Sequence, residues 1–561
     1  FVFAILSMNE AVEVNLGFNI AGNQELPNIL ILSSDGINAR NMSAYGYERE
    51  TTPFIDSLLP KSLVFNNHFS NSAHTAGSVI SLLTGKYPTT TRVIYPPDAL
   101  RGNDSYEHLP GILQKLGYTN ADISVRHYAD TLDLNLLNGF HWANERQNIG
   151  NPLNDFFAPV FSKYPEHGVF LKQSLDRIFG RLLHITGIRD LEDVFETVTM
   201  PQLLDADTDI DIGRMQSLFR FMNETEAPFF VHLHLLGTHG PMFRPMRPLY
   251  SQGQEQVSVH MRDFYDDSIR DFDRYVFEVY KYLEELDMLD NTMVIINSDH
   301  SRNPDAELPI PLVIHFPENS VTGVIDNPSQ RIDIAPTILE YIGITAPDWM
   351  EGQSLLAEER ETPLIISVGS HSLAYVEEVG FEVTISQPPF YTLNSFYVFD
   401  CQHSYVMRVD RATFTNSEIS GYVSPCPEEL LFSEADIARK MLAHLAERNY
   451  EIGSLDWVLA SYVDLERYFS SSNATLSGNN LYVPAINFRS TISAALFTRN
   501  DVGDFLLREN QPPLNQENVA VFDRSTRSLL FPQSDVNGEV LDLKLTIIND
   551  NPLRFDLEIL E

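Results

Sequence analysis

Short apolar runs alternate with amphipathic helical stretches between Pro27 and about Leu356. The runs are apolar at nearly every position, as strands covered on both faces of a sheet are. Strands that alternate with helices imply crossover units and a mainly parallel sheet, so we predict an α/β fold. The predicted strands are residues 29–32, 229–236, 293–296 and 312–316, and the clearest amphipathic helix is 262–286.

The alternation of apolar runs and amphipathic helices gives way to a different pattern after about residue 357. We expect the chain to consist of four segments. The first, 1–26, begins with an apolar stretch typical either of the end of a signal or membrane segment or of an ordinary buried strand. The second, 27–356, is the main α/β domain, and 357–470 continues it. The last, 471–561, contains alternating runs such as 540–548 and is predicted to be a β-rich appendage.

Acidic residues outnumber basic ones by 77 to 38, which gives a formal net charge of −39. This excess argues against a nucleic-acid partner, because nucleic-acid phosphates are held by Lys and Arg. A solvated acidic surface is the simpler explanation, and it names no substrate. The two cysteines, Cys401 and Cys426, are close enough in sequence to form a disulfide, although one pair says little about the compartment.

Polar side chains follow two of the predicted strands at the points where the strands end. Asp35 comes after the first strand, and Asp299 and His300 come after the third. Ligand sites of parallel sheets lie at the carboxyl ends of the strands, and adjacent oxygen and nitrogen donors suit Zn²⁺ or Mn²⁺ better than Ca²⁺. Taken alone, Asp35 is more typical of a helix N-cap and the Asp-His pair of a turn. The two strand ends together favour a metal site.

Two further segments contribute candidate groups. Small polar residues, among them Thr75, precede an apolar helical run, and hydroxyls at a helix N-terminus favour a bound phosphate or sulfate. A hydroxyl beside a metal ion can attack such an anion. His239 lies in a Gly/Pro turn after a predicted strand, where it can protonate a leaving group. Taken alone, Thr75 would be a helix cap and His239 a solvent-facing turn residue.

In combination, these residues resemble the sulfatase family of the alkaline phosphatase superfamily. The resemblance spans about residues 27–356 and implies the alkaline-phosphatase-like α/β sandwich with a mainly parallel central sheet. Five ordered motifs carry it, namely 27–35, 45–56, 82–88, 287–300, and 333–339 with 343–344 and 350–355.

The nucleophile position departs from the sulfatase pattern. Sulfatases carry Cys or Ser there, modified to formylglycine, within a Cys/Ser-x-Pro-x-Arg pattern. The corresponding residue is Thr75, with Gly77 in place of Pro and Val79 in place of Arg. Because Thr cannot become formylglycine, the site pattern is more similar to phosphoethanolamine transferases and lipoteichoic-acid synthases, which use Thr as the nucleophile.

The resemblance implies one divalent metal ion, with Zn or Mn favoured and Ca or Mg as alternatives. Its implied ligands are Asp35, Thr75, Asp299 and His300. Thr75 is implied to be the nucleophile through a phospho-threonine intermediate, and His239 and His127 match residues on the substrate side. Such enzymes act outside the cytoplasm from a membrane anchor, so we expect a periplasmic or cell-surface location and an anchor upstream of residue 1.

We therefore expect a phosphodiesterase or phosphotransferase that acts on small-molecule, lipid or glycan phosphate esters. One alternative is a sulfuric ester hydrolase that uses unmodified Thr75. Another is a non-catalytic protein that binds an anionic glycan or a lipid headgroup. The second alternative is suggested by the short segment between His300 and Pro309 and by the missing Arg at Val79.

Overall fold

The structure is a computed structural model in which His127, both cysteines and the segment 1–25 lie outside the described residues. The described residues are 26–96, 98–126, 128–144, 146–147, 178, 182, 185–186, 209–226, 228–302, 308–357, 360, 364–370, 373–376, 380–383, 392–400, 402–409, 413–419, 432, 434–450, 474–488, 491–500, 502–511, 519–523, 525–550 and 553–560.

The chain divides into two compact units. The first comprises residues 1–406 and 415–432, and the second comprises 407–414 and 433–561. The expected boundaries after residues 26, 356 and 470 stay predictions. Among the described residues, none of the helices combines the length and the apolar character that crossing a membrane requires.

A nine-stranded sheet forms the centre of the first unit, in the order β10-β2-β9-β8-β1-β7-β4-β5-β6. Strand β1 is parallel to both neighbours, β7 and β8, and β4 and β5 continue the same direction. Only β9 and β6 run antiparallel to their neighbours within this described sheet. The strands are β1 (Asn28–Ser34), β2 (Leu63–Phe65), β4 (Thr119–Ile123), β5 (Trp142–Ala143), β6 (Arg146–Gln147), β7 (Phe229–Leu235), β8 (Thr292–Ser298), β9 (Leu312–His315) and β10 (Gly323–Ile325).

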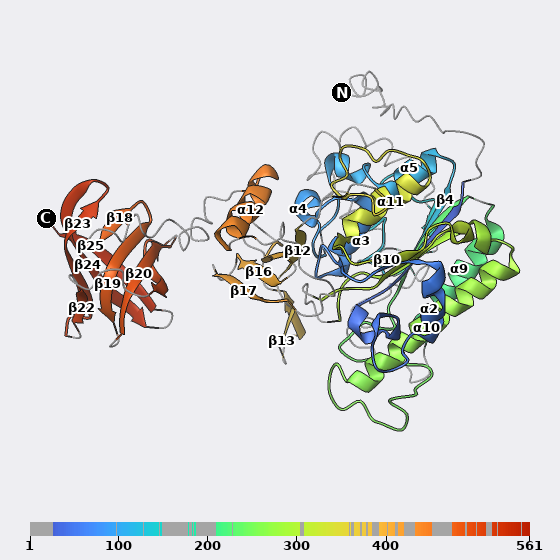
Figure 1. The fold of residues 1–561 in the computed structure, drawn as a ribbon, viewed down its shortest axis with the longest axis horizontal. Coiled ribbons are helices and arrows are strands. Elements are labelled where there is room, and N and C mark those ends of the chain that lie inside the picture. Colours follow the sequence, from blue (N-terminus) through green and yellow to red (C-terminus); the bar gives the residue numbers. More distant parts are fainter. Residues whose placement is uncertain are drawn as a thin grey trace, which may run out of the picture. The chain divides into compact units, whose positions relative to one another are not determined.

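Helices cover both faces of this sheet (Figure 1). Because alternate residues of a strand point to opposite faces, Ile29 and Ile31 of β1 belong to one core, whereas Leu30 and Leu32 belong to the other. Helices α3, α5 and α11 close the first core, and α2, α9 and α10 close the second. The helices are α2 (Pro53–Leu58), α3 (Thr75–Thr84), α4 (Pro88–Thr91), α5 (Leu109–Lys115), α9 (Ile212–Glu224), α10 (Arg262–Glu285) and α11 (Ile334–Tyr341).

The C-terminal part of the chain is rich in β-structure. The second unit holds an eight-stranded sheet, with strands β18 (Thr475–Ser477), β19 (Asn480–Phe488), β20 (Thr491–Arg499), β21 (Phe505–Gln511), β22 (Ala520–Asp523), β23 (Ser528–Val536), β24 (Glu539–Asp550) and β25 (Leu553–Leu560). The elements that precede it in sequence are β12 (Ile365–Gly369), β13 (Leu373–Val376), β14 (Gly380–Val383), β15 (Ser395–Phe399), β16 (His403–Arg408), β17 (Thr413–Glu418) and α12 (Glu434–Glu447).

The predicted fold class is confirmed. The four predicted strands correspond to β1, β7, β8 and β9, and the predicted helix 262–286 corresponds to α10. The alternation of apolar runs and helices therefore gives the mainly parallel sheet that was expected, followed by the expected β-rich region.

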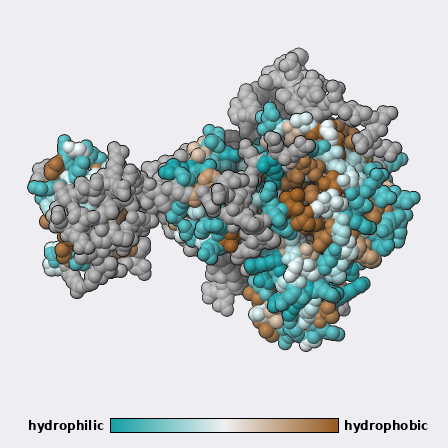
Figure 2. All heavy atoms as spheres, in the orientation of Figure 1, coloured by the Kyte–Doolittle hydropathy of each residue, from teal (hydrophilic) through white to brown (hydrophobic). Residues whose placement is uncertain are grey.

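Side-chain burial differs sharply between the centre and the edge of the main sheet. Ile31 in β1 is fully buried, whereas Val324 in the edge strand β10 is 63% exposed. Figure 2 shows a hydrophobic patch on the first unit, in the region of α11 and β10.

Shortening the buried side chain should therefore destabilise the first unit far more than shortening the exposed one. We expect Ile31→Ala to lower the free energy of unfolding by about 2–5 kcal/mol, because it leaves a cavity in the core. Val324→Ala should change it by less than about 0.5 kcal/mol. Chemical denaturation of the full chain measures both, and equal effects would contradict the arrangement of the sheet.

Candidate active site

Three parallel strands end at one edge of the sheet and bring acidic and imidazole groups together. Ser34 of β1 lies opposite Ser298 of β8, so the next residues, Asp35 and Asp299, leave the sheet side by side. His234 lies at the last position but one of β7, on the other side of β1. Ligand atoms of Asp35, His234 and Asp299 lie within 4.8 Å of one another, and all three residues are buried.

Two carboxylates and two imidazoles converge at this edge. His234 Nε2 lies 3.5 Å from Asp35 Oδ2 and 4.0 Å from Asp299 Oδ2. His300 Nε2 lies 3.3 Å from Asp299 Oδ2 and 3.6 Å from Asp35 Oδ1. Burial alone would raise the pKa of the Asp35 carboxyl, but the charges of His239, His300 and His234 outweigh it and hold the pKa below its ordinary value.

The same environment acts on His300 in the opposite sense. Burial alone would lower the pKa of its imidazole, but the carboxylates of Asp299 and Asp35 outweigh burial and raise the pKa above its ordinary value. Its Nδ1 is 2.8 Å from the carbonyl oxygen of Ser301, to which it donates. His300 therefore directs Nε2 at the two carboxylates.

The unpartnered atoms of this cluster fit a divalent cation. Asp35 Oδ1, Asp299 Oδ2 and both ring nitrogens of His234 are buried without a hydrogen-bond partner among the described residues. Asp299 Oδ1 accepts hydrogen bonds from the amides of Gly36 and His300, at 3.1 and 2.8 Å, which leaves Oδ2 for a cation. Because buried charges without partners are costly, and mixed oxygen and nitrogen ligands suit Zn²⁺ or Mn²⁺, the chemistry of these residues matches a metal site.

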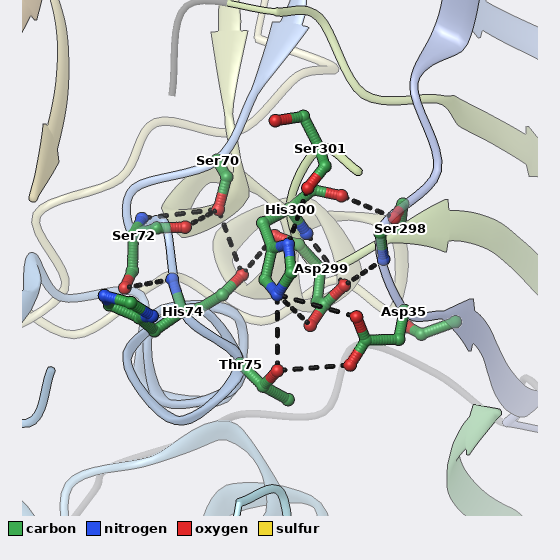
Figure 3. A network of polar contacts seen from close by, with 12 residues as sticks. Asp35, Ser70, Ser72, His74, Thr75, Ser298, Asp299, His300 and Ser301 are labelled. Atoms are coloured by element: carbon green, nitrogen blue, oxygen red, sulfur yellow. Dashed lines mark hydrogen bonds and ion pairs between the residues drawn. The ribbon is translucent and has the colours of Figure 1, made fainter. Parts of the chain in front are cut away.

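The hydroxyl of Thr75 faces this cluster (Figure 3). Its Oγ1 lies 3.3 Å from Asp35 Oδ2 and 3.4 Å from His300 Nε2. Thr75 is the first residue of α3, where backbone amides lack partners within the helix and favour an oxyanion. Gly77 in the same turn has little space beside it, because a Cβ there would come within 2.6 Å of Ser72 Oγ.

A buried guanidinium ties the first turn of α3 to the end of β8. Arg331 is 0% exposed. Its Nε donates to the Ser78 carbonyl at 3.3 Å, and its Nη1 donates to Asn297 Oδ1 at 2.7 Å and to the Ser298 carbonyl. Ser78 Oγ adds a hydrogen bond of 2.5 Å to the carbonyl of Asp299. The segments that carry Thr75 and Asp299 are therefore joined directly.

Arg331 also places a positive charge behind the two carboxylates. Burial lowers the pKa of its guanidinium to about 10, against the opposing effect of the Asp299 charge. The group is therefore still protonated at neutral pH. None of the carboxylates that the structure describes lies within ion-pair distance of the guanidinium. Arg331 and Asp299 therefore interact through a longer-range electrostatic attraction.

The predicted site residues are brought together where they fall within the described part of the chain. Asp35, Thr75, Asp299 and His300 meet as described above, and His239 acts electrostatically on Asp35. His127 lies outside the described residues. The roles assigned to all of them stay predictions.

His234 was not among the expected ligands. Its position carried a usable signal, because His232 and His234 stand two residues apart in a buried strand and so point to the same face. The rings are 6.3 Å apart, and His232 Nδ1 lies 2.9 Å from Asp122 Oδ1. Only His234, which is nearer the carboxyl end of β7, reaches Asp35, Asp299 and His300, and together these four residues form the metal-type cluster.

Comparison with known proteins identifies the family. Residues 27–344 match the family model described as Sulfatase. This chain belongs to the sulfatase family. Related curated proteins include N-acetylgalactosamine-6-sulfatase of Rattus norvegicus, which is 26% identical over an alignment of 302 residues; the match covers 51% of this chain and 52% of the relative. Another is N-acetylglucosamine-6-O-sulfatase of Bacteroides thetaiotaomicron, 21% identical over 60% of this chain and 72% of that protein.

The chain spans about half the length of the first of these relatives. Among solved structures, a phosphonate monoester hydrolase from Silicibacter pomeroyi matches with a TM-score of 0.50 and 16% identity, over 76% of this chain and 97% of that one. A Bacteroides thetaiotaomicron structure described as BT33494S-sulf, from work on glycosaminoglycan metabolism, also gives a TM-score of 0.50 at 16% identity. This match covers 78% of this chain and 100% of that one. At this identity the structural matches establish the fold alone.

The expectation of phosphate-ester chemistry is wrong. It rested on Thr75 in place of the modified Cys or Ser, whereas the family match extends over residues 27–344 and the curated relatives named above are sulfatases. A nucleophile position indicates how an anion is attacked, but sulfate and phosphate are tetrahedral oxyanions of similar size. One residue was therefore a poor guide to the substrate, and phosphoryl transfer and a phospho-threonine intermediate are not retained.

Removing His234 should reduce metal binding. We expect the full chain to contain a divalent ion, and His234→Ala to weaken its binding by about 100-fold or more, because a buried ligand is lost. Elemental analysis and titration with a chelator measure this. His315→Ala is the matched control, since His315 is also buried but bonds to Asn319 away from the site. Equal metal affinity in both variants would contradict the ligand set.

Replacing Arg331 should destabilise the first unit. Arg331→Met removes the donor to three oxygens, and we expect the free energy of unfolding to fall by about 3 kcal/mol. Arg331→Lys keeps the charge and one donor and should lose less. Arg262→Met is the control, because the side chain of Arg262 is 50% exposed and should contribute less than about 1 kcal/mol. A denaturation midpoint unchanged by Arg331→Met would refute this role.

Proposed function

We propose that this chain hydrolyses sulfate esters, with the unmodified hydroxyl of Thr75 as the nucleophile. The observation that carries the proposal is the position of Thr75 Oγ1, 3.3 Å from Asp35 Oδ2 and 3.4 Å from His300 Nε2 at the start of α3. The names of the curated relatives support a sulfated sugar as the substrate class. The expected similarity to phosphoethanolamine transferases and lipoteichoic-acid synthases stays a prediction. Within this proposal it concerns only the use of Thr as the nucleophile.

A divalent ion, with zinc or manganese favoured over calcium or magnesium, would be held by Asp35, His234, Asp299 and His300. When bound, it would supply Lewis-acid stabilisation of the charge on the sulfate oxygens. Thr75 would lie at the edge of this set rather than in its centre, because its hydroxyl contacts one oxygen of Asp35 and one nitrogen of His300.

The residues of the chain perform the remaining steps. Thr75 Oγ1 attacks the sulfur of the ester, and Asp35 Oδ2, the oxygen to which the hydroxyl donates, takes up its proton. The bond from sulfur to the sugar oxygen breaks, and His239 donates a proton to the departing alcohol. The free amides at the start of α3 bind the sulfate oxygens. Water then attacks the sulfur of the sulfo-threonine while His239 takes up one of its protons, the bond from Thr75 Oγ1 to sulfur breaks, and Asp35 returns its proton to Oγ1 as sulfate leaves.

The expectations about the binding partner and the cellular location of the chain stay proposals. The partner is a sulfated glycan or a small-molecule sulfate ester, and the location is outside the cytoplasm. The signal or membrane segment suggested for 1–26 lies almost wholly outside the described residues and adds nothing to the proposal.

Removing the hydroxyl of Thr75 tests the proposed reaction. We expect Thr75→Ala to lower kcat for N-acetylglucosamine 6-sulfate or 4-nitrocatechol sulfate by roughly 10³-fold or more, because the attacking atom is absent. Thr75→Ser should keep measurable turnover. The metal content of both variants should remain close to that of the native chain, since the two carboxylates and His234 are retained.

Thr84→Ala is the matched control, because Thr84 is a buried threonine at the other end of the same helix and donates to the Ile80 carbonyl. It should keep the native rate. The same sugar carrying phosphate instead of sulfate should react more slowly. Turnover retained by Thr75→Ala would refute the nucleophile. Tight binding of the sulfate ester without turnover by the native chain would instead favour the non-catalytic binder.

A further inference from the structure

Two histidines and an arginine lie beside the metal-type cluster. His260 lies over Gly240, because a Cβ built on Gly240 would come within 2.5 Å of His260 Cε1. Gly240 directly follows His239, the residue whose charge acts most strongly on Asp35. His260 is therefore a close neighbour of the turn that faces the reacting groups.

Arg302 lies near the same place, since its charge acts on His260. It follows His300 by two residues, and its Cα lies 3.5 Å from the position of a Cβ on Gly36, next to Asp35. Its amide donates to Asn38 Oδ1 at 2.9 Å, and its guanidinium lies 4.7 Å from the centre of the Tyr265 ring. Tyr265 in turn fixes Gly36, because its hydroxyl donates to the Gly36 carbonyl at 2.7 Å. The position of Arg302 is thus well defined.

Each of these three side chains has one buried polar atom without a partner in the described part of the chain. His239 Nδ1, His260 Nδ1 and Arg302 Nε are buried without a hydrogen-bond partner among the residues that the structure describes. Arg302 forms no ion pair with any described carboxylate. Buried donors without acceptors destabilise a protein, and sites of this kind often face a ligand.

Arg302 gives this group a permanent positive charge. Burial, together with the charges of Arg302 and His239, lowers the pKa of His260, which favours the neutral imidazole with one N–H donor. A local excess of positive charge stands out in a chain whose formal net charge is −39. An anion would find attraction here and repulsion over much of the remaining surface.

We propose that His260 and Arg302 bind a second sulfate group of the substrate, next to the sulfate that is cleaved. This inference rests on the proposed function, and it narrows the substrate to sugars that carry at least two sulfates. A planar guanidinium can donate two parallel hydrogen bonds to sulfate oxygens, and a histidine Nδ1–H can donate a third.

Calorimetric binding to the metal-loaded full chain tests the proposal. The two probes are glucosamine 6-sulfate and glucosamine 2-N,6-O-disulfate. We expect the native chain to bind the disulfate at least tenfold more tightly, which corresponds to one charge-assisted hydrogen bond. Arg302→Gln should bring the ratio of the two dissociation constants close to one, and His260→Gln should reduce the ratio below its native value. Arg302→Lys, which keeps the charge but loses the fork of donors, should give an intermediate ratio.

Arg262→Gln is the matched control, since Arg262 lies two residues from His260 but pairs with Glu48 on the surface. It should keep the native ratio. A native chain that binds both probes equally, or a preference that survives both Gln variants, would overturn the second sulfate site and leave the proposed function standing. Failure of the native chain to bind either probe would overturn both.

Discussion

In the central sheet, β1 runs parallel to both neighbours, with Ser33 opposite His234 of β7 and Ser34 opposite Ser298 of β8. This register is set by the apolar residues further back along each strand, because a shift of one residue would exchange the side chains that fill the two cores on the faces of the sheet. The positions of Asp35, His234 and Asp299 follow from it. The chemistry at the edge of the sheet therefore depends on packing in the middle of the sheet.

Arg331 links the position of α3, the helix that carries the hydroxyl of Thr75, to the same sheet. Two carboxylates in a buried site repel each other, and a permanent positive charge nearby reduces that repulsion. Arg331 supplies such a charge while its hydrogen bonds fix the distance between Ser78 of α3 and Ser298 of β8. A lysine at this position would carry the charge without the fixed geometry.

Much of the fold could be predicted from the sequence, because strands buried on both faces must be apolar throughout and are therefore visible as runs. Asp35 and Asp299 could be found because they interrupt that pattern where a strand ends. His234 was hidden inside a run, where a polar residue is easily taken for a satisfied core histidine. Arg331 could not be found, because its partner Ser78 lies 253 residues away and only the folded chain brings them together.

The hydrogen bond from Ser78 Oγ to the carbonyl of Asp299 has a thermodynamic consequence. It joins the backbone of Asp299 to a side chain in the first turn of α3, so the ordering of the cluster and the ordering of the helix are linked. An ion that binds only the ordered site must then stabilise the folded first unit by mass action, to a degree set by its free concentration relative to its dissociation constant. The supply of metal would thereby regulate how long the protein persists as well as how fast it reacts.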